Sequence, residues 1–352
     1  MEKVCLTTPS MKATIYIGDE AIDSRLPALT QGQKKFVLTD SNVYALYPEF
    51  FKKYFEDTAL FVLPAGEENK NFASLAAILE QMTGACLHRT SRLFAVGGGV
   101  IGDIGGLAAA LYMRGISCVQ IPTSLLAQVD SSVGGKTAID LGGVKNVVGA
   151  FYQPCEVLID PAFLATLPPR EIKCGLGEVV KYAALNGEIF DCLAENKDWT
   201  DRAFLQSLIS ACVRHKARVV EADEKENGER KSLNVGHTTG HAIELSSGLS
   251  HGESVLYGMK LETLMAKQAG VCESEYADKL LAIVDKALAL YPVGEYDFKR
   301  LDEDAKKALS DKKNTGDGKI TMSVAKAKNE WTIFSLPFEE YRAALLKAAK
   351  GL

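Results

Sequence analysis

The sequence predicts an α/β, Rossmann-like N-terminal domain with a mostly parallel sheet, followed by a mostly α-helical C-terminal domain. Short β-branched runs alternate with helical patterns up to Asp160, which is typical of strand–helix crossovers. After Asp160, prolines at positions 161, 168 and 169 interrupt this alternation. The runs that follow have the period of 3.6 expected of helices. We therefore expect one domain over residues 1–160 and a second over residues 161–352.

The first domain is expected to contain strands at Ala13–Ile17, Lys35–Thr39, Leu60–Leu63, Leu93–Val96, Val119–Ile121 and Val157–Ile159. Helical stretches such as Phe72–Met82 and Ile104–Met113 lie between them. Ligands of parallel sheets bind at the carboxyl ends of the strands. The polar residues that follow each strand are therefore the first candidates for a site.

The second domain is expected to be built from helices of period 3.6. They are Glu171–Leu185, Arg202–Ala222, Val235–Ser246, Glu253–Ala269 and Glu275–Ala289, with a final amphipathic helix at Glu340–Lys350. Between the last two, Lys319–Ser323 and Trp331–Phe334 predict one small hairpin.

The composition is that of an ordinary globular protein, with 47% hydrophobic and 24% charged residues in 352. A net charge of −5 argues against a general nucleic-acid binder, although a local basic pocket remains compatible with it. No apolar run reaches the length of about 20 residues that spans a membrane, and the N-terminus lacks the apolar segment of a signal peptide. The eight cysteines form no Cys-x-x-Cys pair, so we expect reduced thiols and a cytoplasmic location.

Two predicted strands end in polar residues that suit a nucleotide. The strand at Lys35 ends in Asp40-Ser-Asn42, where the carboxylate could accept from a ribose hydroxyl or cap the helix that follows. The strand at Leu60 ends in a turn that contains Glu67 and Lys70.

The strand at Leu93 runs into a glycine-rich segment, Gly97–Gly106. Gly97, Gly99 and Gly102 have the Gly-x-Gly-x-x-Gly spacing, which is weak evidence by itself. A ligand can approach such a backbone closely, and a helix beginning here would suit a pyrophosphate. Tight helix–strand packing is the alternative. Asp103 would repel a bare phosphate, so it fits a ribose or nicotinamide contact better.

Gly134-Gly-Lys136-Thr137 is similar to the end of a P-loop, but Asp130 stands where the first glycine of that motif belongs and no strand precedes the segment. We therefore reject an ATPase. What remains is a glycine turn that presents Lys136, followed by Lys145 and Asn146. Two lysines and an asparagine beside glycines indicate an anionic substrate.

Three of the five histidines lie close together in the second domain. His237 and His241 have the i, i+4 spacing that places both on one helical face, and His251 follows ten residues later. Imidazoles so grouped indicate a divalent transition metal, zinc first. A zinc protease would need a glutamate where Thr238 stands, so that class is excluded. From the residues alone, His237 and His241 are the expected ligands, and a helix with two polar residues facing solvent or a satisfied core is the alternative.

Other charged residues lie near this motif. Glu178 and Lys181 are helical neighbours at i, i+3 among apolar residues, so we expect at least one to face inward; a surface pair worth about 0.2–0.5 kcal/mol is the alternative. In the run Arg214-His215-Lys216, we expect Arg214 and His215 to lie on a solvent-exposed basic face of the helix. Arg230, Asn234, His237 and His241 would share one helical face if the helix began early enough.

An ordered series of motifs resembles the 3-dehydroquinate synthase family of the sugar phosphate cyclase superfamily. The motifs are Gly97–Asp103, Met113–Gly115, Pro122–Thr137, Lys145–Asn146, Gly149–Pro154, Gly177–Lys181, Leu233–Glu244 and His251–Glu253. The resemblance runs from about Asp40 to Lys313, with Val144 where the family usually has glycine before Lys-Asn. It implies a lyase that uses NAD and a metal ion, Zn²⁺ or Co²⁺. The implied reaction, step 2 of the shikimate pathway, converts 3-deoxy-D-arabino-heptulosonate 7-phosphate to 3-dehydroquinate and phosphate. Its steps are transient oxidation, phosphate elimination, reduction, ring opening and intramolecular aldol closure.

The resemblance also implies a role for individual residues. The metal ligands would be Glu178, His237 and His251, which makes His241 a substrate contact and proton-transfer candidate instead of a ligand. The NAD contacts would be Asp40, Asn42, Glu67, Lys70, Gly99, Asp103, Thr123, Ser124, Lys136, Lys145 and Thr166. The other catalytic and substrate-binding residues would be Asp130, Lys136, Asn146, Lys181, Lys216, Arg230, Asn234 and Lys312, with Lys313 as the alternative to the last. Arg114 would reach the phosphate from a neighbouring subunit, which implies a homodimer.

Two other enzymes remain as alternatives. A metal-dependent polyol or glycerol-phosphate dehydrogenase would release NADH, and it would not need the anion-binding set Lys136, Lys216, Arg230 and Asn234. A cyclase acting on sedoheptulose 7-phosphate would meet no carboxylate, which argues against it given Lys216 and Arg230. A non-catalytic NAD-binding protein would be expected to have lost metal ligands, and this sequence retains them.

Overall fold

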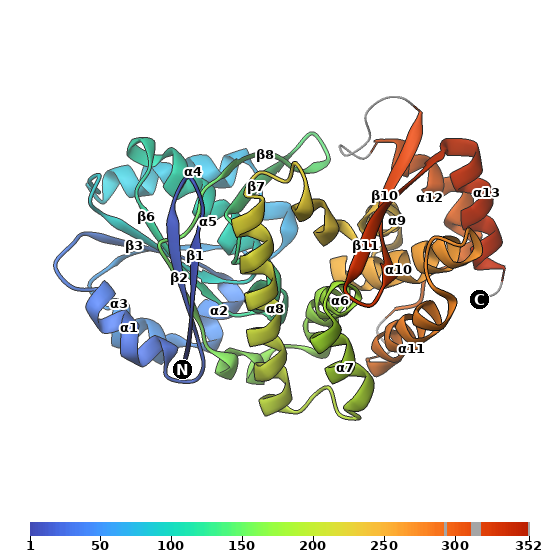
Figure 1. Cartoon of the computed structure of the whole chain (residues 1–352). Helices are drawn as coiled ribbons and strands as arrows, with labels where there is room; N and C mark the ends of the chain where they lie inside the picture. The colour runs from blue at the N-terminus through green and yellow to red at the C-terminus, as the bar shows by residue number, and fades with distance from the viewer. Residues whose placement is uncertain (292–293, 311–317, 351–352) are drawn as a thin grey trace. The chain divides into compact units, whose positions relative to one another are not determined.

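The computed structural model describes residues 1–291, 294–310 and 318–350, and it divides into two compact units (Figure 1). The first comprises Met1–Leu167 with Arg202–Lys225, and the second comprises Pro168–Asp201 with Glu226–Leu352. The sequence places the helix α8 (Arg202–Ala222) in the second domain, and that placement is wrong because α8 packs against β1 (Glu2–Thr7) of the first unit. Helical periodicity reveals that a helix has a buried face but does not reveal which domain buries it.

The first unit is built on a seven-stranded sheet of order β1-β2-β9-β6-β5-β3-β4. After β1, the strands are β2 (Lys12–Ile17), β3 (Lys35–Asp40), β4 (Ala59–Leu63), β5 (Arg92–Gly97), β6 (Ser117–Pro122) and β9 (Glu156–Ile159). Every pair is parallel except β1 with β2. The six predicted strands and the mostly parallel sheet are confirmed, whereas β1 was not predicted.

Helices cover both faces of this sheet (Figure 1). One face packs against α4 (Phe72–Gly84) and α5 (Gly99–Leu111); the other packs against α1 (Ala21–Leu29), α2 (Ser41–Leu46) and α3 (Pro48–Phe55). On β3, Phe36 and Leu38 join the α4–α5 cluster while Val37 joins the other. A strand buried on both faces reads as a continuous apolar run, which is why it was predictable.

Helix α5 begins five residues before its predicted start at Ile104. Glycine disfavours helix by about 1 kcal/mol per residue relative to alanine, so the local sequence hides this first turn. Tertiary packing decides it instead: a Cβ at Gly106 would lie 2.4 Å from Cγ2 of Thr137, so the glycine lets α5 lie close to β7 (Lys136–Leu141).

A hairpin of β7 and β8 (Val144–Phe151) was not predicted. Its two-residue turn, Gly142-Gly143, has φ values of 60° and 79°, as hairpin turns with left-handed residues require. Gly134-Gly135 lies directly before β7 and so leads into a strand. A P-loop would lead into a helix, so the geometry agrees with the rejection of that motif.

The second unit is mostly helical. It contains α6 (Pro169–Leu185), α7 (Gly187–Glu195), α9 (His237–Ser247), α10 (His251–Gln268), α11 (Ser274–Leu290), α12 (Leu301–Lys307) and α13 (Phe338–Ala349). The predicted hairpin is confirmed as β10 (Lys319–Ala327) with β11 (Glu330–Pro337). Helix α10 is central, because α6, α9, α11 and α13 all pack against it. Within the described residues, no helix has both the length and the apolar character needed to cross a membrane.

Candidate active site

Three helices of the second unit bring one carboxylate and two imidazoles together. Glu178 lies in α6, His237 is the first residue of α9 and His251 is the first residue of α10. Oε1 of Glu178 lies 3.1 Å from Nε2 of His251 and 3.4 Å from Nε2 of His237. One candidate ligand atom from each residue lies within 4.8 Å of the others. The arrangement is compact enough for one ion to contact all three.

The opposite nitrogen of each ring is also bonded. Nδ1 of His237 lies 3.0 Å from the carbonyl oxygen of Val235, and Nδ1 of His251 lies 3.0 Å from Oε2 of Glu244. When each Nδ1 carries the hydrogen and donates it, each Nε2 presents a lone pair to the cluster. Metal-binding histidines usually have this second bond. The donor set of two imidazoles and a carboxylate therefore fits Zn²⁺ or Co²⁺.

The cluster favours positive charge. Burial raises the pKa of Glu178, but the neighbouring charges of Lys181 and His237 lower it by more. The pKa of Glu178 therefore lies well below its ordinary value. Burial lowers the pKa of His251, but the carboxylates of Glu178 and Glu244 raise it to about 10. Glu178 thus stays ionised, and the two carboxylates that stabilise an imidazolium would equally stabilise a divalent cation.

His241 lies one turn along α9, with its ring centroid 5.3 Å from that of His237 and 5.9 Å from that of His251. It belongs to a second candidate group, with Glu244 and His251. Among the described residues, no such group contains both His237 and His241. The geometry therefore does not assemble the histidine pair favoured by spacing alone, and it does assemble the trio implied by the family resemblance.

Glycines allow the three helices to approach closely. A Cβ at Gly252 would lie 1.8 Å from the carbonyl oxygen of Cys174, and one at Gly177 would lie 2.4 Å from that of Gly252. Between α9 and α10, a Cβ at Gly258 would lie 2.0 Å from the carbonyl oxygen of Gly236. Each of these is far closer than van der Waals contact. Gly236 and Gly252, which directly adjoin His237 and His251 in the sequence, thus have a packing role that the sequence alone does not reveal.

Lys181 and Arg230 are buried in the second unit. Lys181 pairs with Glu178, and its ammonium lies 4.4 Å from the centroid of the Tyr182 ring. Arg230 is only 1% exposed and lies in the 3₁₀ segment Glu229–Asn234. The prediction that at least one member of the Glu178–Lys181 pair faces inward is confirmed for both.

The condition for aligning Arg230, Asn234, His237 and His241 on one helical face, an early helix start, is not met. Gly236 has a φ of 77°, which ends the 3₁₀ segment and starts α9 at His237, so only the two histidines share a helix. Nδ2 of Asn234 instead donates to Oε1 of Glu226 at 2.6 Å. Glu226 was not among the predicted site residues, and its φ of 62° is a property that the sequence does not display. The predicted Lys312, with its alternative Lys313, lies outside the described residues.

In the first unit, Lys70 joins several residues of the predicted nucleotide set. Its ammonium lies 2.5 Å from Oδ2 of Asp103, 3.7 Å from Oε1 of Glu67 and 2.5 Å from Oδ1 of Asn146. Burial lowers the pKa of Lys70, but Asp103 and Glu67 raise it above the ordinary value. Lys70 therefore remains charged although it is only 3% exposed.

The strand ends carry the other predicted nucleotide residues. Asp40 accepts from the backbone N–H groups of Asn42 and Val43 at 2.9 and 3.0 Å, so its role as a helix cap is confirmed. The N–H of Thr123 donates to the carbonyl of Gly97 at 3.0 Å, which places the ends of β5 and β6 side by side. Ser124 follows, and its Oγ would lie 3.3 Å from a Cβ at Gly98, the residue directly before Gly99 begins α5.

The residues of the first unit that are predicted to bind anions fall into two kinds. Lys216 is buried, and its ammonium lies 3.1 Å from Oδ2 of Asp130 and 2.7 Å from the carbonyl oxygen of that residue. Lys136, Lys145, Asn146 and Arg114 are exposed. Beside Lys216, the expected solvated face is confirmed for Arg214, which is exposed, and is wrong for His215, which is buried.

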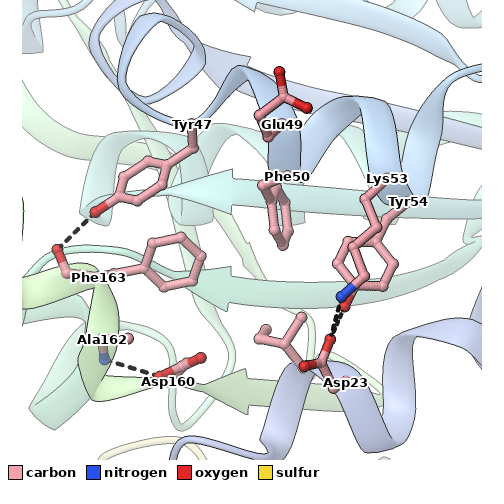
Figure 2. Close-up of a pocket in the computed structure, with 10 residues that line it drawn as sticks. Asp23, Tyr47, Glu49, Phe50, Lys53, Tyr54, Asp160, Ala162 and Phe163 are labelled. Atoms are coloured by element: carbon pink, nitrogen blue, oxygen red, sulfur yellow. Dashed lines mark hydrogen bonds and ion pairs between the residues drawn. The ribbon is translucent and has the colours of Figure 1, made fainter.

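A cavity of about 310 Å³ lies elsewhere in the first unit (Figure 2). The rings of Tyr47, Phe50 and Phe163 line it, and Lys53 and Tyr54 point toward Asp23 on another side. No predicted site residue lines it. Tyr47 links it to Thr166, since the two hydroxyl oxygens lie 2.5 Å apart. The cavity therefore adjoins the predicted nucleotide set without containing it.

Comparison with known proteins identifies relatives along the whole chain. The model of the 3-dehydroquinate synthase N-terminal region matches residues 60–174, and that of the C-terminal region matches residues 175–314. A 3-dehydroquinate synthase of Alkaliphilus metalliredigens (strain QYMF) is 39% identical over 338 residues, covering 93% of this chain and 94% of that protein. One of Enterococcus faecalis (strain ATCC 47077 / OG1RF) is 38% identical over 352 residues, covering 97% of each.

Solved structures share the fold. A 2-deoxy-scyllo-inosose synthase complexed with carbaglucose-6-phosphate, NAD⁺ and Co²⁺ superposes with a TM-score of 0.84 at 22% identity, covering 98% of this chain and 99% of that one. ValA (2-epi-5-epi-valiolone synthase) from Streptomyces hygroscopicus subsp. jinggangensis 5008, with NAD⁺ and Zn²⁺ bound, has a TM-score of 0.81 at 25% identity, covering 100% of both chains. The predicted fold class is thus confirmed. Because two family models cover most of its length and relatives align over nearly all of it, this chain belongs to the 3-dehydroquinate synthase family.

Proposed function

We propose that this chain converts 3-deoxy-D-arabino-heptulosonate 7-phosphate to 3-dehydroquinate and phosphate. The observation that carries the proposal is the convergence of Glu178, His237 and His251 beside the buried Lys181, in a chain of this family. A polyol dehydrogenase would need a metal site but not the further cationic residues Lys216 and Arg230, both of which are buried here.

Glu178, His237 and His251 would hold the metal ion, and the first unit would hold NAD. When bound, NAD accepts and returns a hydride, and the ion lowers the pKa of the hydroxyl that is oxidised. His241 is close enough to the trio to exchange a proton with a substrate hydroxyl there. Lys181 compensates the charge of Glu178, and its ammonium would donate to a substrate oxygen atom near the metal ion.

For NAD, we propose that Glu67 and Asp103, oriented by Lys70, accept from ribose hydroxyl groups. Asp40 would also accept from a ribose hydroxyl group, in addition to capping α2. The close approach of a pyrophosphate would be allowed by Gly99 and by the neighbouring ends of β5 and β6. The remaining proposed contacts are Asn42, Thr123, Ser124, Lys136, Lys145 and Thr166.

The substrate carries two anions, a carboxylate and a phosphate. Arg230 can bind a carboxylate through two parallel hydrogen bonds, which a lysine cannot do. Lys136, Lys216 and Asn146 would supply charge-assisted and neutral donors, and Asp130 would orient Lys216 through their ion pair. Asn234 would bind a substrate hydroxyl or carboxylate through its amide.

We further propose a homodimer in which Arg114 acts on the phosphate in its neighbour's site. In support, Arg114 is exposed and has a φ of 68°, a strained conformation for a residue with a side chain. Met113 beside it has a φ of 51° and is an exposed apolar residue, as an interface would require. Mixing R114A with H241N tests this: a hybrid dimer contains one intact site, so activity should return. No recovery after subunits exchange would refute a shared site.

We also propose that the enzyme acts in the cytoplasm. All eight cysteines lie in the described part of the chain as free thiols. Free thiols are characteristic of a reducing compartment. Enzyme activity found instead in an oxidising extracytoplasmic fraction of the source cell would contradict this location.

The deciding experiment measures phosphate release from 3-deoxy-D-arabino-heptulosonate 7-phosphate with catalytic NAD⁺ and Zn²⁺, while absorbance reports NADH. Phosphate release without net NADH is expected, because the hydride is returned within each turnover. Stoichiometric NADH without phosphate would indicate a dehydrogenase instead. Release only from sedoheptulose 7-phosphate would keep the reaction type and overturn the substrate.

A further inference from the structure

Glu262 is a buried carboxylate of α10 that faces the beginning of α9. It is 1% exposed. Its Oε1 accepts a hydrogen bond from the backbone N–H of Thr239 at 2.7 Å, and its Oε2 accepts one from the N–H of Gly236 at 3.1 Å. The first N–H groups of a helix have no partner within that helix. Glu262 therefore caps α9 from a neighbouring helix.

Another part of the chain must cap α9, because the residue at its N-cap position has no side chain that could do so. Gly236 is the N-cap residue of α9, and its φ is 77°. A Cβ at Gly236 would lie 2.2 Å from Cγ of Met259 and 2.9 Å from the carbonyl oxygen of Val255. The serine, threonine, aspartate or asparagine that normally caps a helix is excluded by this packing. The carboxylate on α10 replaces it.

The carboxylate and the helix start stabilise each other. Burying a charge is costly unless hydrogen bonds and opposite charge compensate it. The two N–H groups donate to Glu262, and the positive end of the α9 dipole lies beside it. Side-chain contacts also hold this turn: Thr238 donates to the carbonyl of Thr321 at 3.1 Å. Those contacts bind side chains, whereas Glu262 binds the backbone itself.

This arrangement bears directly on the metal site that the proposed function requires. His237 lies between the two residues whose N–H groups bind Glu262, and His251 begins the helix that carries Glu262. One helix thus supplies one ligand and holds the start of the helix that supplies another. We infer that Glu262 is a positioning residue, which keeps Nε2 of His237 within reach of the ion held by Glu178 and His251.

The test is Co²⁺ binding by the full chain without substrate, measured by competition with a chromophoric chelator. Glu262→Gln keeps the shape of the side chain but offers one acceptor oxygen where two N–H groups need acceptors. We expect its dissociation constant for Co²⁺ to rise about 10-fold or more, as loss of a group that orients a ligand does elsewhere. The visible absorption of bound Co²⁺ should also change, because it reports the ligand geometry.

Lys260→Gln is the matched control. Lys260 lies two residues away on α10 and forms a surface pair with Asp285 at 2.7 Å. Its substitution also changes charge by one unit but leaves the start of α9 intact. We expect the affinity and absorption spectrum of Co²⁺ in this variant to equal those of the wild type.

The possible outcomes separate the two proposals. A lower melting temperature for Glu262→Gln with wild-type Co²⁺ affinity and spectrum would show a merely structural residue and overturn the inference. The cyclase would survive that result. Wild-type chain that binds no Co²⁺ would overturn both. If the variant does not fold, Glu262→Asp decides, because it keeps the charge and both acceptor oxygens but is one methylene too short to reach both N–H groups: wild-type Co²⁺ affinity and absorption spectrum in this variant would overturn the inference.

Discussion

Nε2 of His251 lies 3.1 Å from Oε1 of Glu178, although the two residues are 73 positions apart in the chain. The contact joins the start of α10 to the middle of α6. It depends on the close approach of the two helices, and so on glycines at their contact. A substitution can therefore damage this site either at a ligand or at the packing behind it, and the two effects can be measured separately.

His241→Asn should remove activity and leave the metal bound. His241 is outside the trio around Glu178, so its loss should lower kcat about 10²–10⁴-fold, as expected for a proton-transfer group. His237→Asn is the comparison, and it should lose metal and activity together. Zinc content per chain and phosphate release are measured for both. Loss of zinc from the His241 variant would mean that the group of His241, Glu244 and His251 is the metal site instead.

Gly252→Ala should separate α6 from α10. The new Cβ would lie 1.8 Å from the carbonyl oxygen of Cys174, so backbone must move. We expect a loss of stability of at least about 1–3 kcal/mol, the usual cost of overpacking, and a weaker affinity for zinc. Urea denaturation and chelator competition measure the two. Gly84→Ala is the control, because no atom lies within 4 Å of its added Cβ; equal behaviour of the two variants would contradict the prediction.

Lys70→Met should weaken both folding and NAD binding. Removing the ammonium leaves the partly buried carboxylate of Asp103 without its partner at 2.5 Å, which should cost about 3 kcal/mol of unfolding free energy. The double variant with Asp103→Asn should recover part of that stability, but not NAD affinity. Denaturation gives the coupling energy, and NAD titration gives the dissociation constant. Strictly additive stability losses would show that the pair is not coupled.

Asp304→Asn should destabilise the protein at neutral pH and much less in acid. Burial raises the pKa of Asp304, but hydrogen bonds from Lys307, Ser246 and Tyr296 lower it below its ordinary value of 3.8. Because the pKa of Asp304 is lower in the folded than in the unfolded state, the ionised carboxylate stabilises the folded protein above pH 3.8. This stabilisation is lost as the pH falls through the folded-state pKa. We expect a loss of about 1–3 kcal/mol at pH 7.

Urea denaturation from pH 7 to pH 3 measures this effect. Asp285→Asn, which breaks a surface pair with Lys260, should show almost no difference at any pH. A difference for Asp304→Asn that stays constant down to pH 3 would mean that the carboxylate charge is not the source of its contribution.

The parallel strands were predictable because their residues are buried on both faces, as in Phe36–Leu38. The β7–β8 hairpin was not, because its residues on β8 are mostly exposed and no apolar alternation marks them. In the site, motif resemblance implied that Glu178 and His251 are metal ligands, a role that spacing alone did not assign to them. Glu226 was missed because a left-handed φ leaves no local sequence pattern. Glu262 was missed because it caps a helix other than its own, which leaves no local pattern either.

The return of residues 202–225 to the first unit means that the chain passes between the units three times. A single cut therefore yields neither unit whole. A fragment ending at Leu167 would lack α8, whose Glu224 accepts from Thr8 and whose Glu221 accepts from the N–H of Thr7. Its complement would carry the apolar face of α8 without the strand that covers it. Chimeras between members of this family should accordingly exchange residues 202–225 together with residues 1–167, at three junctions instead of one.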